Sequence, residues 1–159
     1  MDPDFDKHPD KNGYHQKPAP STLTGADRRA ARTAAIANFK RLLDLPYSVA
    51  CENPATSYIN KAIRPPDQVV HPYHFGDDAS KATGWWLSDG VPKLVIDPAD
   101  YCQPRFVGDT KPLPRWANQT DSGQNRVSPG ADRWLERSET YPGIAAAMGQ
   151  WGSWLNRAL

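Results

Sequence analysis

Apolar residues recur at helical spacing in two segments of the chain. The first segment starts at Thr24 or Gly25 and ends before Leu45-Pro46, with an apolar stripe of Ala31, Ala35, Ile36, Phe39, Leu42 and Leu43. The second follows Pro142, with a stripe of Ile144, Ala147, Met148, Trp151, Trp154 and Leu155. Spacings of three and four place side chains on one helix face, so both segments are predicted to be amphipathic helices. The second helix is expected to pack against a sheet.

Short runs of β-branched, aromatic and small residues between turn signals predict strands. We expect strands over residues 47–52, 68–73, 83–87 and 93–96, and short helices over 55–63 and 132–138. The small and β-branched residues of the first strand suit a buried position. Because a helix that leads directly into a buried strand is one half of an α/β unit, the predicted fold class is α/β.

Two segments have neither a helical nor a strand pattern. Residues 1–22 are polar and interrupted by prolines, which predicts an irregular or disordered arm before a single domain over residues 23–159. Residues 98–130 form a long irregular loop, and loops of this length are usually functional or disordered. The arm contains His8 and His15 near four aspartates. Nothing rigid orients these groups, so a solvated tail is favoured over a metal site.

Composition narrows the class of protein further. The 16 prolines among 159 residues exclude a helical bundle over the full length, because proline interrupts helix interiors. With 19 basic and 18 acidic residues the net charge is +1, which indicates neither a nucleic-acid nor an acidic partner. The two cysteines argue against a disulfide scaffold and a four-thiolate zinc site. No apolar run suits a membrane span or a signal peptide, so a cytoplasmic protein without a membrane partner is expected.

The first group of candidate functional residues is Glu52-Asn53-Pro54, at the carboxyl end of a predicted buried strand. Ligands of open α/β sheets bind outside the carboxyl ends of strands. A carboxylate there can accept a hydrogen bond from an exocyclic amine, or share a proton with a ring nitrogen when burial raises its pKa. The alternative, in which Glu52 caps the following helix, has equal weight from these residues alone.

The second group, residues 71–87, places two imidazoles, a tyrosine, a lysine and two indoles around a glycine turn. Aromatic rings near cations suit stacking on a base or clamping of a phosphate, with His74 and Lys81 as candidate ligands. In the alternative, Trp86 belongs to the core and the histidines bond to backbone groups. The two histidines lack a third ligand at suitable spacing, which disfavours zinc.

Two further groups lie nearer to the carboxyl end. Residues 115–126 combine guanidinium and amide groups of the kind that contact phosphates and base edges. The candidates in this segment are Arg115, Asn118, Gln119 and Arg126. A disordered polar loop has the same composition and is the favoured alternative. Arg137 and Ser138 precede the last helix, whose first N–H groups can bind an anion, although ordinary capping is commoner.

Several motifs occur in a characteristic order along the chain. They are Glu52-Asn-Pro; His71-Pro-Tyr-His-Phe-Gly-Asp with Lys81, Thr83 and Trp85-Trp-Leu; Arg115-Trp-Ala-Asn-Gln-Thr; and Arg137-Ser-Glu-Thr-Tyr-Pro-Gly-Ile. As an ordered set, covering roughly residues 26–152, they resemble the carboxy-terminal part of phage and prophage proteins described as cytosine-C5 DNA methyltransferase-like.

The resemblance implies a partial Rossmann-like methyltransferase sheet flanked by helices. It implies that Glu52 contacts the ring nitrogen and amine of a target cytosine, with Asn53 and Pro54 beside it. It also implies that the segment containing Tyr141 and Gly143 returns to an S-adenosylmethionine pocket. DNA or a nucleotide would then be the ligand.

The sequence also departs from this family. No glycine-rich strand-to-helix turn, acidic strand end or Pro-Cys nucleophile segment precedes the first predicted helix. Cys102 follows Glu52 in the chain and lacks the preceding proline, which disfavours it as the nucleophile. Cys51 is expected to be a packed small hydrophobe, because it points to the opposite strand face from Glu52. S-adenosylmethionine is therefore expected to bind weakly to this chain alone, and no metal is expected.

Three functions stay open at this point. The chain is a methyltransferase half completed in trans by a second chain, a non-catalytic phage factor that binds nucleic acid, a nucleotide or a protein in an interaction or counter-defence role, or an inactive remnant. The two helix stripes carry more apolar surface than four short strands bury. We therefore expect an open apolar sheet edge that is covered by a second copy, a complementary chain or the amino-terminal arm.

Overall fold

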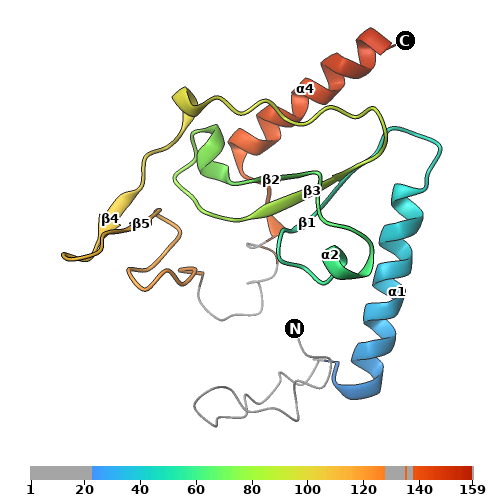
Figure 1. The fold of residues 1–159 in the computed structure, drawn as a ribbon, viewed down its shortest axis with the longest axis horizontal. Coiled ribbons are helices and arrows are strands. Elements are labelled where there is room, and N and C mark those ends of the chain that lie inside the picture. Colours follow the sequence, from blue (N-terminus) through green and yellow to red (C-terminus); the bar gives the residue numbers. More distant parts are fainter. Residues whose placement is uncertain (1–22, 128–134, 136–137, 159) are drawn as a thin grey trace.

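A computed structural model describes residues 23–127, 135 and 138–158 of the chain. Its centre is a three-stranded sheet of β1 (Ala50–Pro54), β3 (Thr83–Leu87) and β2 (Gln68–Val70), in the order β1-β3-β2 (Figure 1). The central strand β3 is antiparallel to both neighbours. Consequently β1 and β2 run parallel to each other without pairing.

One face of the sheet packs on helix α4 (Pro142–Ala158). Opposed residues in an antiparallel pair share a face, and the register places Trp85 opposite both Glu52 and Gln68. This face supplies part of the first core cluster, which comprises Val70, Trp85, Leu87, Leu94, Ile144 and Ala147. The two α4 residues in this cluster belong to the predicted stripe, so the packing of this helix on a sheet is confirmed.

The other face packs on helix α1 (Gly25–Leu43) and the short helix α2 (Ile59–Ala62). Phe39, Ile59 and Trp86 form the second core cluster, and the rings of Phe39 and Trp86 meet edge to face with centroids 5.4 Å apart. With helices on both faces, β3 is buried at all five positions. A Cβ on Gly84 would lie 2.9 Å from the Trp86 ring, so glycine is required there for the indole to lie across the strand.

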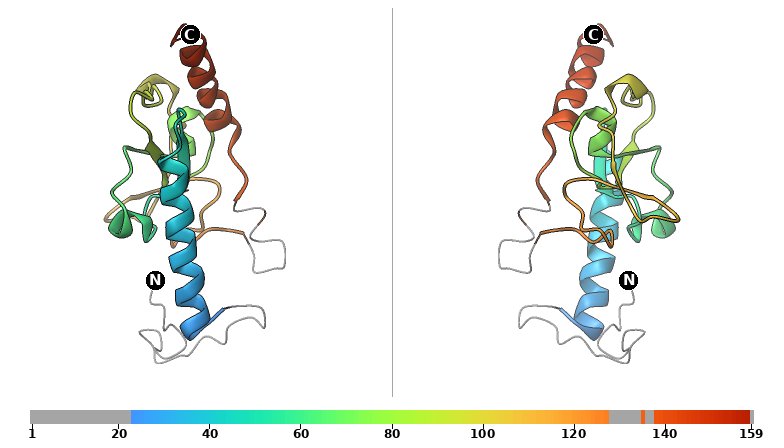
Figure 2. Two further views of the ribbon diagram at one scale, coloured as in Figure 1. Left: turned by 90° about the vertical axis from the view of Figure 1, so that its right-hand side faces the viewer. Right: turned by 90° about the vertical axis from the view of Figure 1, so that its left-hand side faces the viewer.

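Helix α1 matches its predicted bounds but packs along only part of its length. The predicted stripe residue Phe39 is buried, whereas Ala31 and Ala35 in the first half are exposed. The two views of Figure 2 show this first half extending beyond the sheet, while α4 extends toward the opposite end. The stripe therefore contributes to the core only from Ile36 onward.

Several predicted elements differ in the structure. The first strand occupies Ala50–Pro54 instead of 47–52 and is not buried, since Tyr47 is 74% exposed and Glu52 is exposed. The segment 68–73 divides into β2 and a 3-10 helix, η1 (Pro72–Phe75), because Pro72 cannot continue the ladder. The helix predicted over 55–63 is reduced to α2.

The predicted strand at 93–96 is an extended segment without a strand partner. The Gln68 side chain replaces that partner: its Nε2 donates to Leu94 O at 2.9 Å, and its Oε1 accepts from Leu94 N at 2.9 Å. Helix α4 holds the same segment from the other side, where Gln150 Oε1 accepts from Val95 N and Trp151 Nε1 donates to Pro92 O.

The predicted long loop contains regular structure. It includes the 3-10 helix η2 (Pro98–Asp100) and a separate hairpin of β4 (Arg105–Val107) and β5 (Leu113–Arg115). In Figure 1 this hairpin projects from the body on the side opposite α1. The predicted helix at 132–138 and the arm at 1–22 fall outside the described residues, except for Leu135 and Ser138.

The structure thus confirms a mixed α and β fold. The ladders among the described residues are antiparallel and small, and a Rossmann-like methyltransferase arrangement is not confirmed. Within the part of the chain that is described, no helix combines the length and apolar character needed to cross a membrane.

Candidate functional site

An open cleft of about 720 Å³ lies where β1 ends and β3 begins. Four segments that are distant in the sequence line it. They are residues 52–56 after and within β1, residues 80–82 before β3, parts of the loop 119–127, and residues 138 and 141 before α4. Seven predicted site residues meet here, namely Glu52, Asn53, Pro54, Lys81, Gln119, Ser138 and Tyr141.

Strand β1 supplies one wall of the cleft. Glu52 is exposed and pairs with Trp85 on the α4 side of the sheet, while Asn53 is half-buried. The wall is closed at its end by two backbone bonds: Ser57 N donates to Pro54 O at 2.9 Å, and Ala55 N donates to Ala82 O at 3.0 Å. The carboxylate therefore lies on a fixed strand and not on a free loop.

A second wall is formed by residues 80–82. The Nζ of Lys81 donates to Glu139 O at 3.2 Å, which connects this wall to the segment before α4. The side chain of Asn118 makes two hydrogen bonds to the backbone of Ser80, the residue before Lys81. Its Oδ1 accepts from Ser80 N at 2.9 Å and its Nδ2 donates to Ser80 O at 3.0 Å. Since both ends of its amide are used, Asn118 positions the wall and is not itself among the lining residues.

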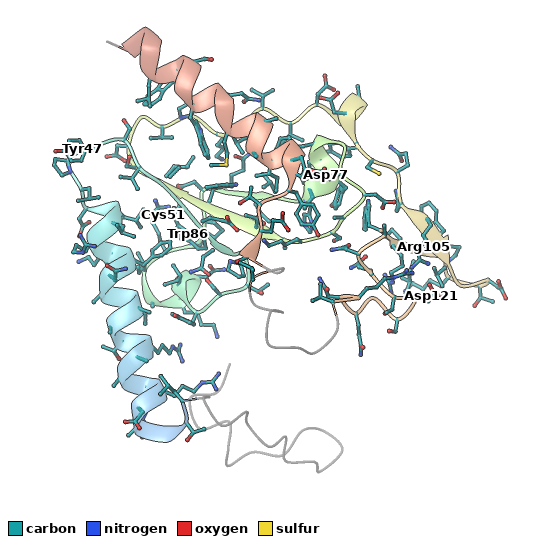
Figure 3. The ribbon with its side chains drawn as sticks, turned by 180° about the vertical axis from the view of Figure 1, so that it is seen from behind. Tyr47, Cys51, Asp77, Trp86, Arg105 and Asp121 are labelled. Atoms are coloured by element: carbon teal, nitrogen blue, oxygen red, sulfur yellow. The ribbon has the colours of Figure 1, made fainter. Side chains whose placement is uncertain are left out.

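Arginines hold the loop that forms the third wall. Arg105 of β4 pairs with Asp121 at 2.6 Å and donates to Gln119 O at 2.8 Å, and Arg126 Nε donates to the same carbonyl (Figure 3). Arg115 Nε donates to Asp121 O at 3.1 Å. The predicted ligands Arg115 and Arg126 are thus used on backbone carbonyls, behind the lining residues Gly123 and Asn125.

The turn after η1 makes hydrogen bonds to two segments that lead into the walls of the cleft. Gly76 has a φ of 87°, which glycine adopts freely, and lets the chain reverse into two aspartates. Asp77 Oδ2 accepts from Gly143 N at 2.9 Å in the first turn of α4 (Figure 3). Asp78 Oδ1 accepts from Ala117 N at 2.8 Å. These two carboxylates connect the turn to α4 and to the loop at Ala117.

His74 belongs to an aromatic cluster and not to the lining of the cleft. Its ring stacks on Tyr101 with centroids 4.9 Å apart, and Tyr73 stacks on Trp116 at 4.2 Å. The Nδ1 of His74 accepts from His71 N at 3.2 Å, which requires a neutral ring. Burial lowers the pKa of His74 and favours this neutral form. The alternative prediction, in which the histidines bond to backbone groups, is therefore the correct one for His74.

Both cysteines lie outside the lining of the cleft. Cys51 is half-buried and packs against the second core cluster near Trp86 (Figure 3), as predicted, and burial raises the pKa of its thiol. Desolvation raises the pKa of the Cys102 thiol, and the carboxylates of Asp78 and Asp77 raise it further. A raised pKa leaves less thiolate at neutral pH, which is the opposite of what a nucleophile needs.

The two residues matched to an S-adenosylmethionine pocket have different surroundings. Tyr141 lines the cleft, but a Cβ on Gly143 would lie 2.7 Å from Asp77 Oδ2 and 2.8 Å from the Phe75 side chain. Gly143 therefore serves close packing of α4 on the turn after η1. Among the described residues, no group of three or more His, Cys, Asp or Glu could hold a metal ion.

Sequence reasoning missed some residues of the site and included one that the structure does not describe. Ser80 and Asn125 line the cleft but were not named as candidates, although they lie within the candidate groups 71–87 and 115–126. Arg105 was missed because its role depends on a hairpin that has no clear sequence pattern. Arg137, like His8 and His15, lies outside the described residues.

No protein-family model, curated protein or solved structure matches this chain. The chemistry of the cleft follows from its own groups. These are one exposed carboxylate, one lysine ammonium, the amides of Asn53, Gln119 and Asn125, and a tyrosine ring. The amide oxygens of Gln119 and Asn125 already accept hydrogen bonds from Trp116 N and Val127 N, which leaves their NH₂ groups as donors. Such a set can accept and donate hydrogen bonds to a planar polar ring and can neutralise one anionic group.

Proposed function

We propose that this chain is the base-recognising part of a phage-type DNA cytosine methyltransferase-like protein, and that its cleft receives one nucleobase of a DNA strand. The observation that carries the proposal is the convergence of residues 52–54, 81, 119, 138 and 141 on one cleft. These residues represent all four groups of candidate functional residues found in the sequence. The side chains in each group are of types that suit binding of a base or a phosphate.

The groups in the cleft suit a cytosine and its phosphate. An ionised Glu52 accepts a hydrogen bond from an exocyclic amine, and amides on the facing loop complete the polar edge. Lys81 lies on the neighbouring wall and supplies one positive charge, which suits one backbone phosphate better than a triphosphate. The Tyr141 ring offers a face for stacking on the base.

The sheet is compatible with this proposal. Both ladders of the sheet are antiparallel, so the pairing pattern alone does not distinguish this proposal from other small α and β folds. The cleft lies at the carboxyl end of β1, where open α/β sheets bind their ligands. The position of the cleft is the feature of the sheet that supports the proposal.

Methyl transfer would require a second chain that carries the nucleophile and the cofactor site. Cys102 lies outside the lining of the cleft and has a raised pKa, and Gly143 is closed off by Asp77. Without such a chain the protein binds DNA but does not modify it, which corresponds to the non-catalytic binding role.

Fluorescence anisotropy with a labelled single-stranded oligodeoxynucleotide tests the proposal. We expect binding that depends on one central cytosine and weakens when thymine replaces it. Glu52→Gln should weaken binding about tenfold, because a charged hydrogen bond is lost, whereas Asp109→Asn on the exposed hairpin turn should not. Lys81→Ala should weaken binding and reduce its salt dependence, whereas Lys93→Ala should do neither. Equal affinity of all four variants would refute the proposed site.

A further inference from the structure

We infer that the outer edge of β1 binds an apolar strand of a separate polypeptide. This inference rests on the proposed function, because it names the surface through which a second chain would complete the protein. Its physical support is the hydrogen bonding and burial of β1.

Hydrogen bonds beyond both ends of β1 determine which of its residues face outward. Ser88 N donates to Val49 O at 2.9 Å, and Ala55 N donates to Ala82 O at 3.0 Å. Bonding alternates along an antiparallel pair, so Cys51 and Asn53 bond to β3. Ala50 and Glu52 therefore direct their N–H and C=O groups to the outer edge. Within the described part of the chain, no hydrogen bond reaches these four groups.

Both hydrophobic clusters continue to this edge without being closed there. Ala50 is half-buried against the first core cluster on the α4 side, and Cys51 is half-buried against the second core cluster on the α1 side. A strand added here would therefore lie beside Ala50 on one face and Cys51 on the other, each at the margin of an apolar cluster. Strands covered on both faces are nearly continuous apolar runs, so this is the chemistry expected of the partner.

The edge lacks several of the features that prevent strand addition. Natural edge strands are protected by short length, charged side chains, bulges, central prolines or a covering element. Of these, β1 has a length of five residues and one charged side chain, Glu52, which lines the cleft. In β1 the only proline is Pro54 at the last position, and the ladder with β3 continues without a bulge from Ala50 to Pro54. Extended peptides bind to such edges through main-chain hydrogen bonds, with side-chain pockets giving specificity.

The arm of this chain does not have the required apolar run, and pairing of β1 with the β1 strand of a second copy is disfavoured by charge. Residues 1–22 contain no two consecutive residues from Val, Ile, Leu, Phe and Met. A second copy would offer β1 itself, which carries Glu52 and Pro54 on one face. Two β1 strands paired in this way would bring two Glu52 carboxylates onto the same face, where like charges repel.

A synthetic peptide with an uninterrupted run of Val, Ile and Leu between terminal lysines serves as the probe. The control peptide has proline at alternate positions of the run. We expect the probe to slow amide hydrogen exchange of Ala50 and Glu52 by about tenfold or more at saturation, and the control peptide to have no effect. Cys51 and Asn53, which already bond to β3, should change less.

The variant Ala50→Pro removes an outward N–H without removing a bond to β3. It should weaken binding of the probe about tenfold or more in calorimetry, whereas Ala50→Ser should bind like the wild type. Protection of other amides in place of Ala50 and Glu52 overturns the inference. If Ala50→Pro does not fold, the exchange result on the wild-type chain decides alone.

Two outcomes separate this inference from its alternatives. Sedimentation that finds a wild-type dimer and an Ala50→Pro monomer would assign the edge to a second copy and overturn the inference. Probe binding without any oligonucleotide binding would refute the proposed function but leave the edge intact. Oligonucleotide binding without probe binding would refute the inference about the β1 edge but leave the proposed function intact.

Discussion

Gly143 and Gly149 lie in the same helix but in contrasting surroundings. A Cβ on Gly143 would meet Asp77 Oδ2 at 2.7 Å, whereas a Cβ on Gly149 would have nothing within 4 Å. The first glycine is thus needed for the contact between α4 and η1, and the second only lowers the helix propensity. Residue type alone does not distinguish them.

Substitution of each glycine by alanine should have opposite effects. We expect Gly143→Ala to lower the free energy of unfolding by about 1–3 kcal/mol, because the methyl group forces α4 away from the turn. Gly149→Ala should raise it by up to about 1 kcal/mol through helix propensity. Urea denaturation measures both. Equal effects would mean that the contact at Asp77 is not tight.

His74 gives the protein a predictable response to acid. Burial lowers the pKa of His74 below its ordinary value of 6.5, and burial together with the nearby His74 charge lowers that of His71. The unfolded chain therefore binds these protons more readily than the folded protein. The resulting stabilisation is complete above about pH 6.5 and is lost as the pH falls through the lower folded-state pKa values.

The variant His74→Asn should reduce this pH dependence. An amide oxygen can accept the hydrogen bond from His71 N without titrating, although the ring contacts are lost. We expect lower stability than the wild type at pH 7 and a smaller decrease between about pH 7 and pH 5. Urea denaturation across this range tests it, and an unchanged slope would assign the acid response to other groups.

At the scale of elements, those with a local pattern were predictable. Helices α1 and α4 follow from apolar spacing, and β3 follows from its aromatic residues, with bounds of 83–87 as predicted. The segment 93–96 has an equally suitable composition, but its hydrogen-bond partner is the side chain of Gln68. No sequence pattern reveals that a side chain replaces a strand.

Gln68→Ala should detach this segment. Leu94 is buried, so its N–H and C=O would lose their partner without gaining full access to water. We expect a loss of about 1–3 kcal/mol in the free energy of unfolding and faster exchange of the Leu94 amide. The control Gln103→Ala removes an exposed amide and should have little effect. Slow exchange of Leu94 in Gln68→Ala would contradict this role.

The residue types of the candidate site were predictable, but not which of these residues line the cleft and which only position its walls. Glu52, Lys81 and Gln119 line the cleft as expected. Asn118, Arg115 and Arg126 lie outside the lining and use their polar groups on the backbone of this chain. Lys81 Nζ and Gln119 Oε1 also bond to backbone groups, although both residues line the cleft. Amides and guanidiniums bond equally well to a ligand or to a loop, and only the folded path of residues 116–127 decides between these roles.

At the scale of the whole molecule, the described residues that line the cleft include no cysteine that could act as a nucleophile. Purified protein mixed with labelled S-adenosylmethionine and DNA should therefore transfer no methyl group, because no activated thiolate lines the cleft. Filter-bound radioactivity measures this, and Cys102→Ser should leave the background unchanged. Incorporation that is abolished by Cys102→Ser would make Cys102 the catalyst.

The strand order β1-β3-β2 also has a consequence for synthesis of the protein on the ribosome. The first two strands do not pair with each other, and their common partner ends only at Leu87. Until that residue leaves the exit tunnel, the nascent chain holds two unpaired strands and an α1 whose Phe39 has no indole to pack against. A translational pause before residues 83–87 would therefore prolong an aggregation-prone state, whereas a pause after them would not.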